Sequence, residues 1–313
     1  MLEMLFMGGG GGSPVEPVPA SGPYALFAGG SENATTVYDS TERRVYSNDT
    51  NLVGGKLLGG RYNLAGAGNS TLAIFSGGIA SGTSTQLAST NRYLHADHTV
   101  TLGTALAATR YVHSGGGVSA HALFAGATTS TNLTTDRYTY ASNVVASGGT
   151  LTAGRVESVQ FGNGTYTWLT GGYASGAVQT GLTSTDRINI ANAAVVANNN
   201  MAQGRRGPGA INISTYGIVS SGYSDGSYFL TSEKYTYSAG TYAAGTAIGS
   251  TARTRILGTG NTTVGIMAGG STGTNYLDNT DKYTYAASTY AASVALNGTR
   301  GRGASASSTP GNF

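Results

Sequence analysis

The chain has 313 residues, of which 50 are Gly, none is Cys and only 10% are Asp, Glu, Lys or Arg. Its 17 basic and 14 acidic residues leave a net charge of +3, without the concentrated Lys and Arg that nucleic-acid binding requires. The lack of Cys excludes disulfides and thiolate metal sites, and no apolar run approaches the roughly 18 to 20 residues of a membrane-spanning helix. Because 20 Tyr are interleaved with apolar residues, we expect a soluble, folded β protein rather than a disordered one.

Residues 1–24 differ in character from the rest of the chain. An apolar start is followed by five glycines at positions 8–12 and a proline-rich stretch at positions 13–19. The segment has neither the basic beginning nor the cleavage site of a secretory signal. We predict an N-terminal arm and a flexible or polyproline-like linker over 1–24, and a single folded domain over 25–313.

From residue 25 onward the chain repeats itself, and three landmarks recur in each copy. The first is a short apolar run ending in glycine, such as residues 74–78, which predicts a buried strand. The final glycines of successive runs are 48, 48, 46, 50 and 48 residues apart. These six runs occupy residues 25–30, 74–78, 123–126, 168–172, 218–222 and 266–270. The spacing therefore indicates six copies of one unit.

The second landmark is a Ser or Thr, usually followed by an acid and then a base, leading into alternating residues such as the Tyr-Thr-Tyr of 138–140. Alternation with a period of two predicts a strand with two different faces. The six copies begin at Thr41, Thr90, Thr135, Thr185, Ser232 and Thr280. Segments 241–244 and 289–292 then predict a further strand at the end of the unit, which gives four short strands per copy.

The third landmark is an apolar residue with Arg four positions later, or five in the fifth copy. The pairs are Leu57 and Arg61, Leu106 and Arg110, Leu151 and Arg155, Met201 and Arg205, Ile248 and Arg253, and Leu296 and Arg300. We expect each arginine to open the innermost strand of its unit.

The three landmarks together resemble the kelch repeat over roughly residues 25 to 308, and this resemblance implies a six-bladed β-propeller with four strands per blade. The Trp that kelch repeats usually carry near the fourth strand is replaced by Tyr242 or Tyr290 in some copies. The chain enters the repeats at a second strand and leaves them through residues 300–305, which have the character of a first strand. We therefore predict that the C-terminal strand closes the ring in the first blade, which removes exposed sheet edges.

Two interpretations apply to the repeated arginines, Arg61, Arg110, Arg155, Arg205, Arg253 and Arg300. If they gather around the central channel, they could bind an anion or a sugar. Alternatively, each one pairs with an acid or a carbonyl group of its own or the next blade, because a buried guanidinium needs partners. We favour the structural interpretation, since a device of the fold is repeated in every blade whereas a binding site uses a few differing residues.

The loops after the glycine-ending strands vary most between copies, and variable loops on a rigid scaffold are where recognition usually occurs. Five aromatic residues in or near these loops are candidates for stacking on a ligand: Tyr173, Tyr223, Tyr228, Phe229 and Tyr276.

No enzyme chemistry is predicted. The copper site of galactose oxidase, which also has kelch repeats, needs a Cys that this chain lacks, and the Asp boxes of sialidase propellers are missing. The second repeat holds His95, Asp97, His98, His113 and His121, but their spacing matches no standard metal motif. We therefore predict no catalytic residue, no metal and no cofactor.

The charge-poor composition, rich in Gly, Ala, Ser and Thr, and the glycine-rich N-terminal segment resemble the fibre, appendage or decoration proteins of tailed bacteriophages. This resemblance implies a structural or attachment protein of the virion within a larger assembly. Residues 1–24 would contact other virion proteins, and the propeller would contact neighbouring subunits or a host glycan. The alternative is a bacterial carbohydrate-binding or carbohydrate-active propeller, located outside the cell or at its surface.

Overall fold

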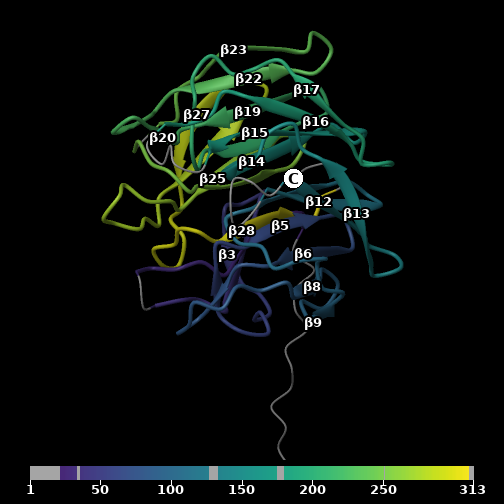
Figure 1. Ribbon diagram of the computed structural model, residues 1–313. Helices are drawn as coiled ribbons and strands as arrows, with labels where there is room; N and C mark the ends of the chain where they lie inside the picture. The colour runs from purple at the N-terminus through teal and green to yellow at the C-terminus, as the bar shows by residue number, and fades with distance from the viewer. Residues whose placement is uncertain (1–21, 34–35, 127–132, 175–179, 250, 310–313) are drawn as a thin grey trace, which may run out of the picture.

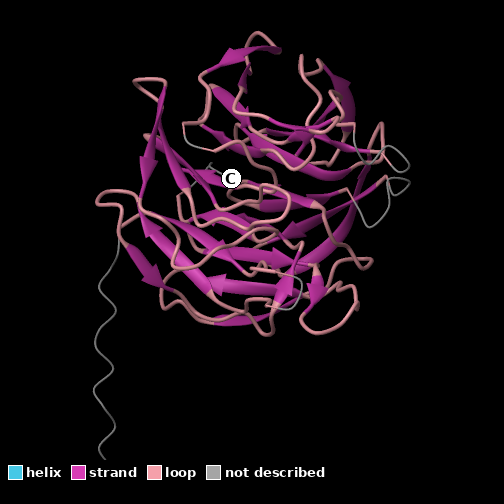
Figure 2. Cartoon of the chain, turned by 90° about the vertical axis from the view of Figure 1, so that its left-hand side faces the viewer, coloured by secondary structure: helices cyan, strands magenta, loops and turns pink. Residues whose placement is uncertain are grey.

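The computed structural model describes residues 22–33, 36–126, 133–174, 180–249 and 251–309. This part of the chain contains six four-stranded antiparallel sheets and two two-stranded ribbons, and no helix. The sheets are arranged around a central axis as a six-bladed β-propeller (Figures 1 and 2). The predicted fold class and blade composition are confirmed, whereas the predicted N-terminal arm lies outside the described residues as far as position 21.

In each blade the strands follow one another from the central channel outward. The first three blades are β28 (Ala304–Ser307), β1 (Tyr24–Ala28), β2 (Thr41–Val45) and β3 (Asn51–Val53); β5 (Ala65–Gly68), β6 (Leu72–Ser76), β8 (Thr90–Leu94) and β9 (Val100–Gly103); and β10 (Ser114–Gly117), β11 (His121–Ala125), β12 (Thr134–Thr139) and β13 (Val144–Thr150). The last three are β14 (Val156–Gly162), β15 (Tyr166–Tyr173), β16 (Thr185–Asn189) and β17 (Val195–Asn198); β18 (Gly209–Asn212), β19 (Tyr216–Ser220), β22 (Ser232–Thr236) and β23 (Thr241–Gly245); and β24 (Leu257–Gly260), β25 (Val264–Ala268), β26 (Thr280–Thr284) and β27 (Thr289–Ser293). The ribbons are β4 (Arg61–Tyr62) with β7 (Ile79–Ala80), and β20 (Tyr223–Ser224) with β21 (Ser227–Tyr228).

The hydrophobic core lies between the blades, with one cluster of buried side chains at each of the six interfaces. Second strands such as β1 and β6 are buried along their whole length, because neighbouring blades cover both of their faces. In the third strands the alternation predicted from the sequence places a Tyr in each of several interfaces, and Tyr93, Tyr138 and Tyr235 are almost completely buried. The apolar runs and the tyrosines of the repeat therefore hold the blades together.

The ring closes in the first blade, where the C-terminal strand β28 pairs antiparallel with β1, from Ala304 opposite Ala28 to Ser307 opposite Ala25. In Figure 1 this yellow strand lies among the purple and blue strands of the N-terminal part. The prediction of closure by the C-terminal strand is confirmed.

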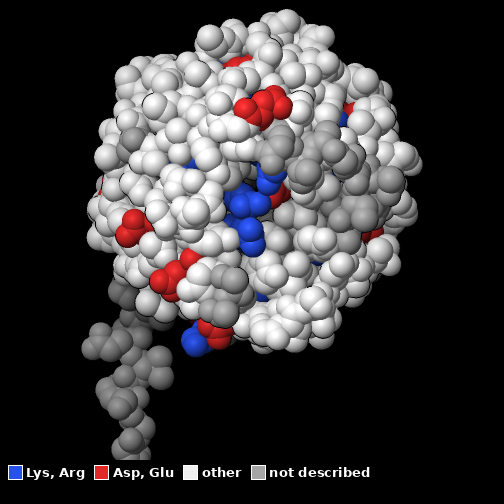
Figure 3. Space-filling model, turned by 60° about the vertical axis from the view of Figure 1, so that its left-hand side comes forward, with Lys and Arg blue, Asp and Glu red and all other residues white. Residues whose placement is uncertain are grey.

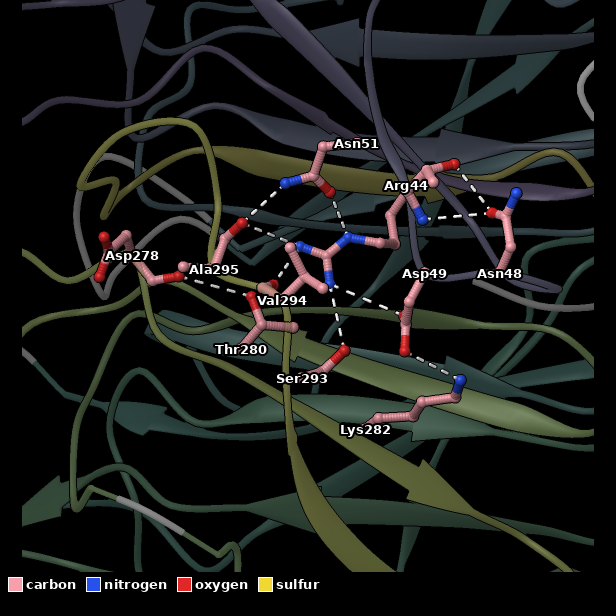
Figure 4. Close-up of polar contacts among 11 residues, drawn as sticks. Arg44, Asn48, Asp49, Asn51, Asp278, Thr280, Lys282, Ser293, Val294 and Ala295 are labelled. Atoms are coloured by element: carbon pink, nitrogen blue, oxygen red, sulfur yellow. Dashed lines mark hydrogen bonds and ion pairs between the residues drawn. The ribbon is translucent and has the colours of Figure 1, made fainter.

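A polar network joins the first blade to the sixth (Figure 4). The fully buried Arg44 on β2 donates to the Ser293 hydroxyl at 3.3 Å and to the carbonyl oxygens of Val294 and Ala295. Asp49 lies 3.8 Å from Arg44 and 3.1 Å from the Lys282 amine on β26. This seam therefore combines apolar packing with charge-assisted hydrogen bonds, which are stronger than neutral ones.

The first and third landmarks of the repeat meet across blade boundaries. The Gly172 amide donates to the carbonyl oxygen of Arg205 in the next blade at 2.7 Å, and Gly78 donates in the same way to Arg110 at 2.7 Å. Gly30, Gly222 and Gly270 repeat this contact with Arg61, Arg253 and Arg300, each at 2.8 Å. At each of these contacts the glycine has a positive φ angle, which glycine adopts more readily than any other residue. The contact therefore explains why the strand ends in glycine.

Candidate functional site

The six repeated arginines are buried within the blades, with at most 4% of their surface exposed. Arg110, for example, donates to the carbonyl oxygens of Gly126 at 2.7 Å and Thr134 at 3.1 Å, at the ends of β11 and β12. Arg61, Arg155, Arg205, Arg253 and Arg300 also donate to backbone carbonyl oxygens. None of the six is among the described residues that line the central channel, so they brace the loops of their blades.

Four of these arginines also pair with an acid on the third strand of the same blade. The pairs are Arg110 with Asp136 at 2.7 Å, Arg155 with Asp186 at 3.3 Å, Arg205 with Glu233 at 3.6 Å, and Arg253 with Asp281 at 2.8 Å. The second blade has Asn91 in place of the acid, and its side-chain oxygen accepts a hydrogen bond from the Leu58 amide at 2.8 Å. These geometries agree with the structural interpretation of the repeated arginines.

A ring of six residues, which we call the mouth ring, surrounds one end of the central channel. Each member lies two residues after a repeated arginine, and each has a positive φ angle between 51° and 59°. The members are Asn63, Val112, Glu157, Gly207, Arg255 and Arg302. Five backbone hydrogen bonds of 2.6 to 3.0 Å join one member to the next, as from the Val112 amide to the Asn63 carbonyl. The ring therefore has a repeated backbone, whereas its side chains differ from blade to blade.

Glu157 organises one side of this ring. Its carboxylate accepts a hydrogen bond from Arg206 Nε at 3.0 Å and another from Arg255 Nε at 2.9 Å. Arg255 also brings a terminal nitrogen within 2.8 Å of the same carboxylate. The Glu157 side chain is 5% exposed, and those of Arg206 and Arg255 are 14% and 19% exposed. These ion pairs are therefore partly shielded from water. In such a place charge interactions are stronger than at an open surface.

Arg302 is placed differently from the other two arginines. Its guanidinium carbon lies 5.6 Å from the centre of the Tyr276 ring and 6.0 Å from that of Tyr62, on which it makes cation–π contacts. Within the described part of the chain, its side chain has no hydrogen-bond or ion-pair partner, and Nε is buried. Burial, followed by the positive charge of Arg255, lowers the pKa of Arg302 below its usual value. The charge of Glu157 partly opposes this shift, but no acid among the described residues contacts the Arg302 guanidinium. Keeping Arg302 charged in this partly buried place therefore costs free energy.

Three of the predicted contact residues lie beside these arginines. Arg206 makes cation–π contacts with Tyr173 at 4.8 Å and Tyr223 at 5.4 Å, and Arg302 makes one with Tyr276. Tyr228 packs on Tyr223 at 4.9 Å, and the two rings come from β21 and β20. An Asp-Gly pair at 225–226 forms the turn of this ribbon, as expected for a two-residue hairpin loop.

The remaining predicted contact residue, Phe229, stacks on Arg205 at 5.4 Å, and Arg205 is a buried structural arginine. Phe229 therefore lies against a blade loop, outside the residues that line the channel.

Arg206, Arg255, Arg302 and Glu157 together form the arginine hollow. Figure 3 shows basic side chains gathered in a depression of one face, next to acidic atoms, on a surface with few other charges. The mouth ring and residues deeper in the channel, including Ser158, Gln160 and Ser305, line an open cavity of about 120 Å³. The hollow is therefore the entrance to a narrow channel.

Two histidines of the second repeat, His95 and His98, pack on the same pair of tyrosines, Tyr24 and Tyr93. His95 Nδ1 lies 2.8 Å from the Tyr24 hydroxyl, and His98 lies 2.7 Å from Arg43 and 3.0 Å from the Tyr93 hydroxyl. His113 is buried beside the channel, 3.0 Å from the Ser76 hydroxyl. Burial, with the nearby Arg110 charge, lowers the pKa of His113 to about 3. In the part of the chain that the structure describes, no three His, Cys, Asp or Glu residues are grouped to hold a metal ion.

The arginine hollow lies outside the three landmarks of the repeat. Those landmarks include the repeated arginines, whereas the hollow uses positions one and two residues further along the chain. Aligned on the repeated arginine, the six copies have Asn, Val, Glu, Gly, Arg and Arg in one column. A position whose residue type varies from copy to copy, at a fixed place in a regular scaffold, is typical of a binding site. The recurring landmarks of the repeat do not include such a position.

Fold and site together define a six-bladed β-propeller with a charged, tyrosine-flanked channel mouth. No protein-family model matches the chain, and no curated protein matches it significantly in sequence. A solved structure titled "Structure of YjhT" matches 79% of this chain and 87% of its own chain, with a TM-score of 0.64 and 12% identity. At this identity the similarity supports the shared fold alone. Separately, the described residues include no helix that is long and apolar enough to cross a membrane.

Proposed function

We propose that this propeller is a non-enzymatic attachment or structural protein of a tailed-bacteriophage virion that contacts a host-surface glycan through the arginine hollow. The observation that carries the proposal is the hollow itself, in which arginines and tyrosines from several blades converge on one entrance. Aromatic rings offer stacking surfaces for sugars, and guanidinium groups offer several fixed donors. The proposal also includes the kelch-like character of the repeat and the resemblance of the composition to that of tailed-phage proteins.

The chemistry of the hollow favours binding over hydrolysis. Most glycosidases use two carboxyl groups on either side of the bond that they cleave. Among the described residues that line the channel, Glu157 is the sole carboxylate, and two arginines already engage it. The described residues that line the channel therefore do not supply the two carboxyl groups of that mechanism.

The first test is a glycan array probed with the full-length protein, with sugar release measured on every glycan that binds. Retention of a glycan without release of sugar is the expected result. Release of sugar would instead favour the second candidate, a carbohydrate-active propeller. If no glycan is retained, the glycan-binding part of the proposal is wrong.

The virion part of the proposal needs a separate test, which is electron cryomicroscopy of the protein in its native assembly. We expect a six-bladed ring attached to a virus particle through residues 1–24, with the arginine hollow facing outward. A free protein that is not part of any particle would contradict the assignment to a virion.

A further inference from the structure

The arginine hollow has an excess of positive charge. It contains three guanidinium groups and one carboxylate, and Glu157 is already shared between Arg206 and Arg255. The four groups therefore carry two positive charges that no acid of the hollow neutralises. A partly dehydrated cation is costly unless an anion or several hydrogen bonds compensate it, so this arrangement favours an anionic ligand.

Arg302 is the group best placed to receive that anion. The tyrosine rings of Tyr62 and Tyr276 contact its guanidinium, whereas its N–H groups have no partner among the described residues. A guanidinium that is held by aromatic contacts keeps its N–H groups for hydrogen bonding. Those groups match a carboxylate in a planar, two-bond geometry.

The backbone around Arg302 keeps this arrangement in place. The Asn63 amide donates to the Arg302 carbonyl oxygen at 2.6 Å, which fixes the residue in the mouth ring. Gly301 lies directly against the Tyr276 ring, and a Cβ at this position would overlap with that ring. The site is therefore built before any ligand arrives, which reduces the entropy lost on binding.

We propose that the arginine hollow binds the carboxylate of an acidic saccharide, with Arg302 as the principal anion-binding residue and the flanking tyrosines contacting the sugar ring. This inference rests on the proposed glycan-binding function and names the chemical class of the ligand. Arg255 contributes positive charge but keeps its hydrogen bonds to Glu157.

The test is a calorimetric titration of the full-length protein at low ionic strength with D-glucuronate, and in parallel with D-glucose and inorganic sulfate. We expect glucuronate to bind, and glucose and sulfate to bind at least about tenfold more weakly. Arg302→Met, which removes the charge at similar side-chain length, should weaken glucuronate binding by roughly ten- to hundredfold. Arg302→Lys, which keeps the charge but loses the planar fork, should have an intermediate affinity.

Arg187→Met is the matched control. Arg187 also stacks on a tyrosine, Tyr166, at 4.7 Å, but it is not among the residues that line the channel. Its substitution should leave glucuronate affinity unchanged. Because the Arg302 side chain has no described hydrogen-bond partner, the melting temperature of Arg302→Met should be close to that of the unmodified protein. If Arg302→Met is destabilised, the glucuronate affinity of Arg302→Lys serves as the test instead.

Other outcomes overturn the inference in distinguishable ways. If glucose binds as well as glucuronate and Arg302→Met has no effect, the glycan-binding function can stand but the acidic ligand is wrong. If sulfate binds as well as glucuronate, the hollow is a general oxyanion site and the saccharide is wrong. If no glycan or sugar binds in any assay, the glycan-binding part of the proposed function fails together with the inference.

Discussion

At the scale of single residues, the mouth ring combines a demanding backbone with free choice of side chain. Five of its six members are not glycine, although all six have left-handed φ angles. Val112 is the most unusual, because a β-branched residue at a φ of 51° is a conformational outlier. The backbone bonds on either side, from Val112 to Asn63 and from Glu157 to Val112, hold it there. Backbone strain of this kind persists only where the surrounding structure holds the residue in place.

Replacing Val112 with Asn should relieve this strain. Asn tolerates the left-handed conformation, and it already occupies the equivalent position, Asn63, in the second blade. We expect Val112→Asn to raise the free energy of unfolding by about 1 kcal/mol, measured by chemical denaturation. A neutral or destabilising effect would show that the packing of Val112 outweighs its backbone strain.

His113 should make the free energy of unfolding depend on pH. Its pKa is 6.5 in an unfolded chain but about 3 in the fold, because burial and Arg110 disfavour its charged form. Between these values the unfolded chain binds a proton that the folded protein does not, so stability decreases as the pH falls through this window. Each such group contributes a slope of up to about 1.4 kcal/mol per pH unit.

The measurement is the free energy of unfolding between pH 7 and pH 4 for the unmodified protein and for His113→Gln. The variant should show the shallower dependence. Its slope will not be zero, because burial also lowers the pKa of His95 to about 4. Parallel curves for the two proteins would rule out His113 as a source of the acid sensitivity.

The candidate site could be predicted only in part from individual residues. Tyr173, Tyr223 and Tyr276 could be proposed because they lie in variable loops, and the structure brings them to the arginine hollow. Arg302 and Glu157 could not, since they meet residues from other blades, such as Tyr276 and Arg206. No local sequence pattern contains those contacts, which depend on the position of each blade around the axis.

At the scale of structural elements, the glycine at the end of the second strand also connects the blades, at five of the six boundaries in the described part of the chain. The Gly172 amide reaches the Arg205 carbonyl of the next blade, and Gly171 packs on the same carbonyl. A Cβ at Gly171 would lie 2.7 Å from that oxygen, closer than real Cβ contacts allow. The glycine pairs of the repeat therefore serve two purposes, since they turn the chain and let the next blade approach.

Gly171→Ala should consequently be more destabilising than an alanine at a glycine with the same backbone but open surroundings. Gly82 is the suitable comparison, because its φ is +71°, near the +67° of Gly171, and nothing lies within 4 Å of its Cβ position. We expect Gly171→Ala to cost roughly 1 to 3 kcal/mol more than Gly82→Ala in thermal or chemical unfolding. Equal costs would mean that backbone strain alone accounts for both effects.

At the scale of the whole molecule, the first blade is assembled from both ends of the described chain. Strand β28 completes this blade next to β1, and the Arg44 network joins it to the sixth blade. Without β28, the fully buried strand β1 would expose an edge that is covered in the closed ring.

A chain that stops after Gly303 should therefore lose cooperative unfolding and aggregate. The control is a chain that stops after Thr309, which keeps β28 and its hydrogen bonds to the Tyr24 backbone through Ser308. Calorimetry and size-exclusion chromatography should show a single sharp transition and a single peak for the control only. A cooperative transition in the shorter chain would show that closure is dispensable.

Most of the architecture could be predicted from the sequence because a propeller repeats its physical requirements in every blade. The apolar runs specify the second strands, the Tyr-Thr alternation specifies the third, and the position at which the repeats begin and end specifies the closure. The acid partners of Arg110 and Arg253 were also foreseeable, since a buried guanidinium needs them. The contact of each glycine pair with the next blade was not, because the sequence does not give the distance between blades.

The closure in the first blade also has a consequence for biosynthesis. A ribosome produces residues 24–28 long before residues 304–307, yet these two strands must pair with each other. Throughout elongation, the apolar β1 segment lacks strand β28, which covers one of its edges in the folded protein. The nascent protein therefore keeps an unpaired, aggregation-prone strand edge until the last strand emerges, and pairing with β28 is the step that covers it.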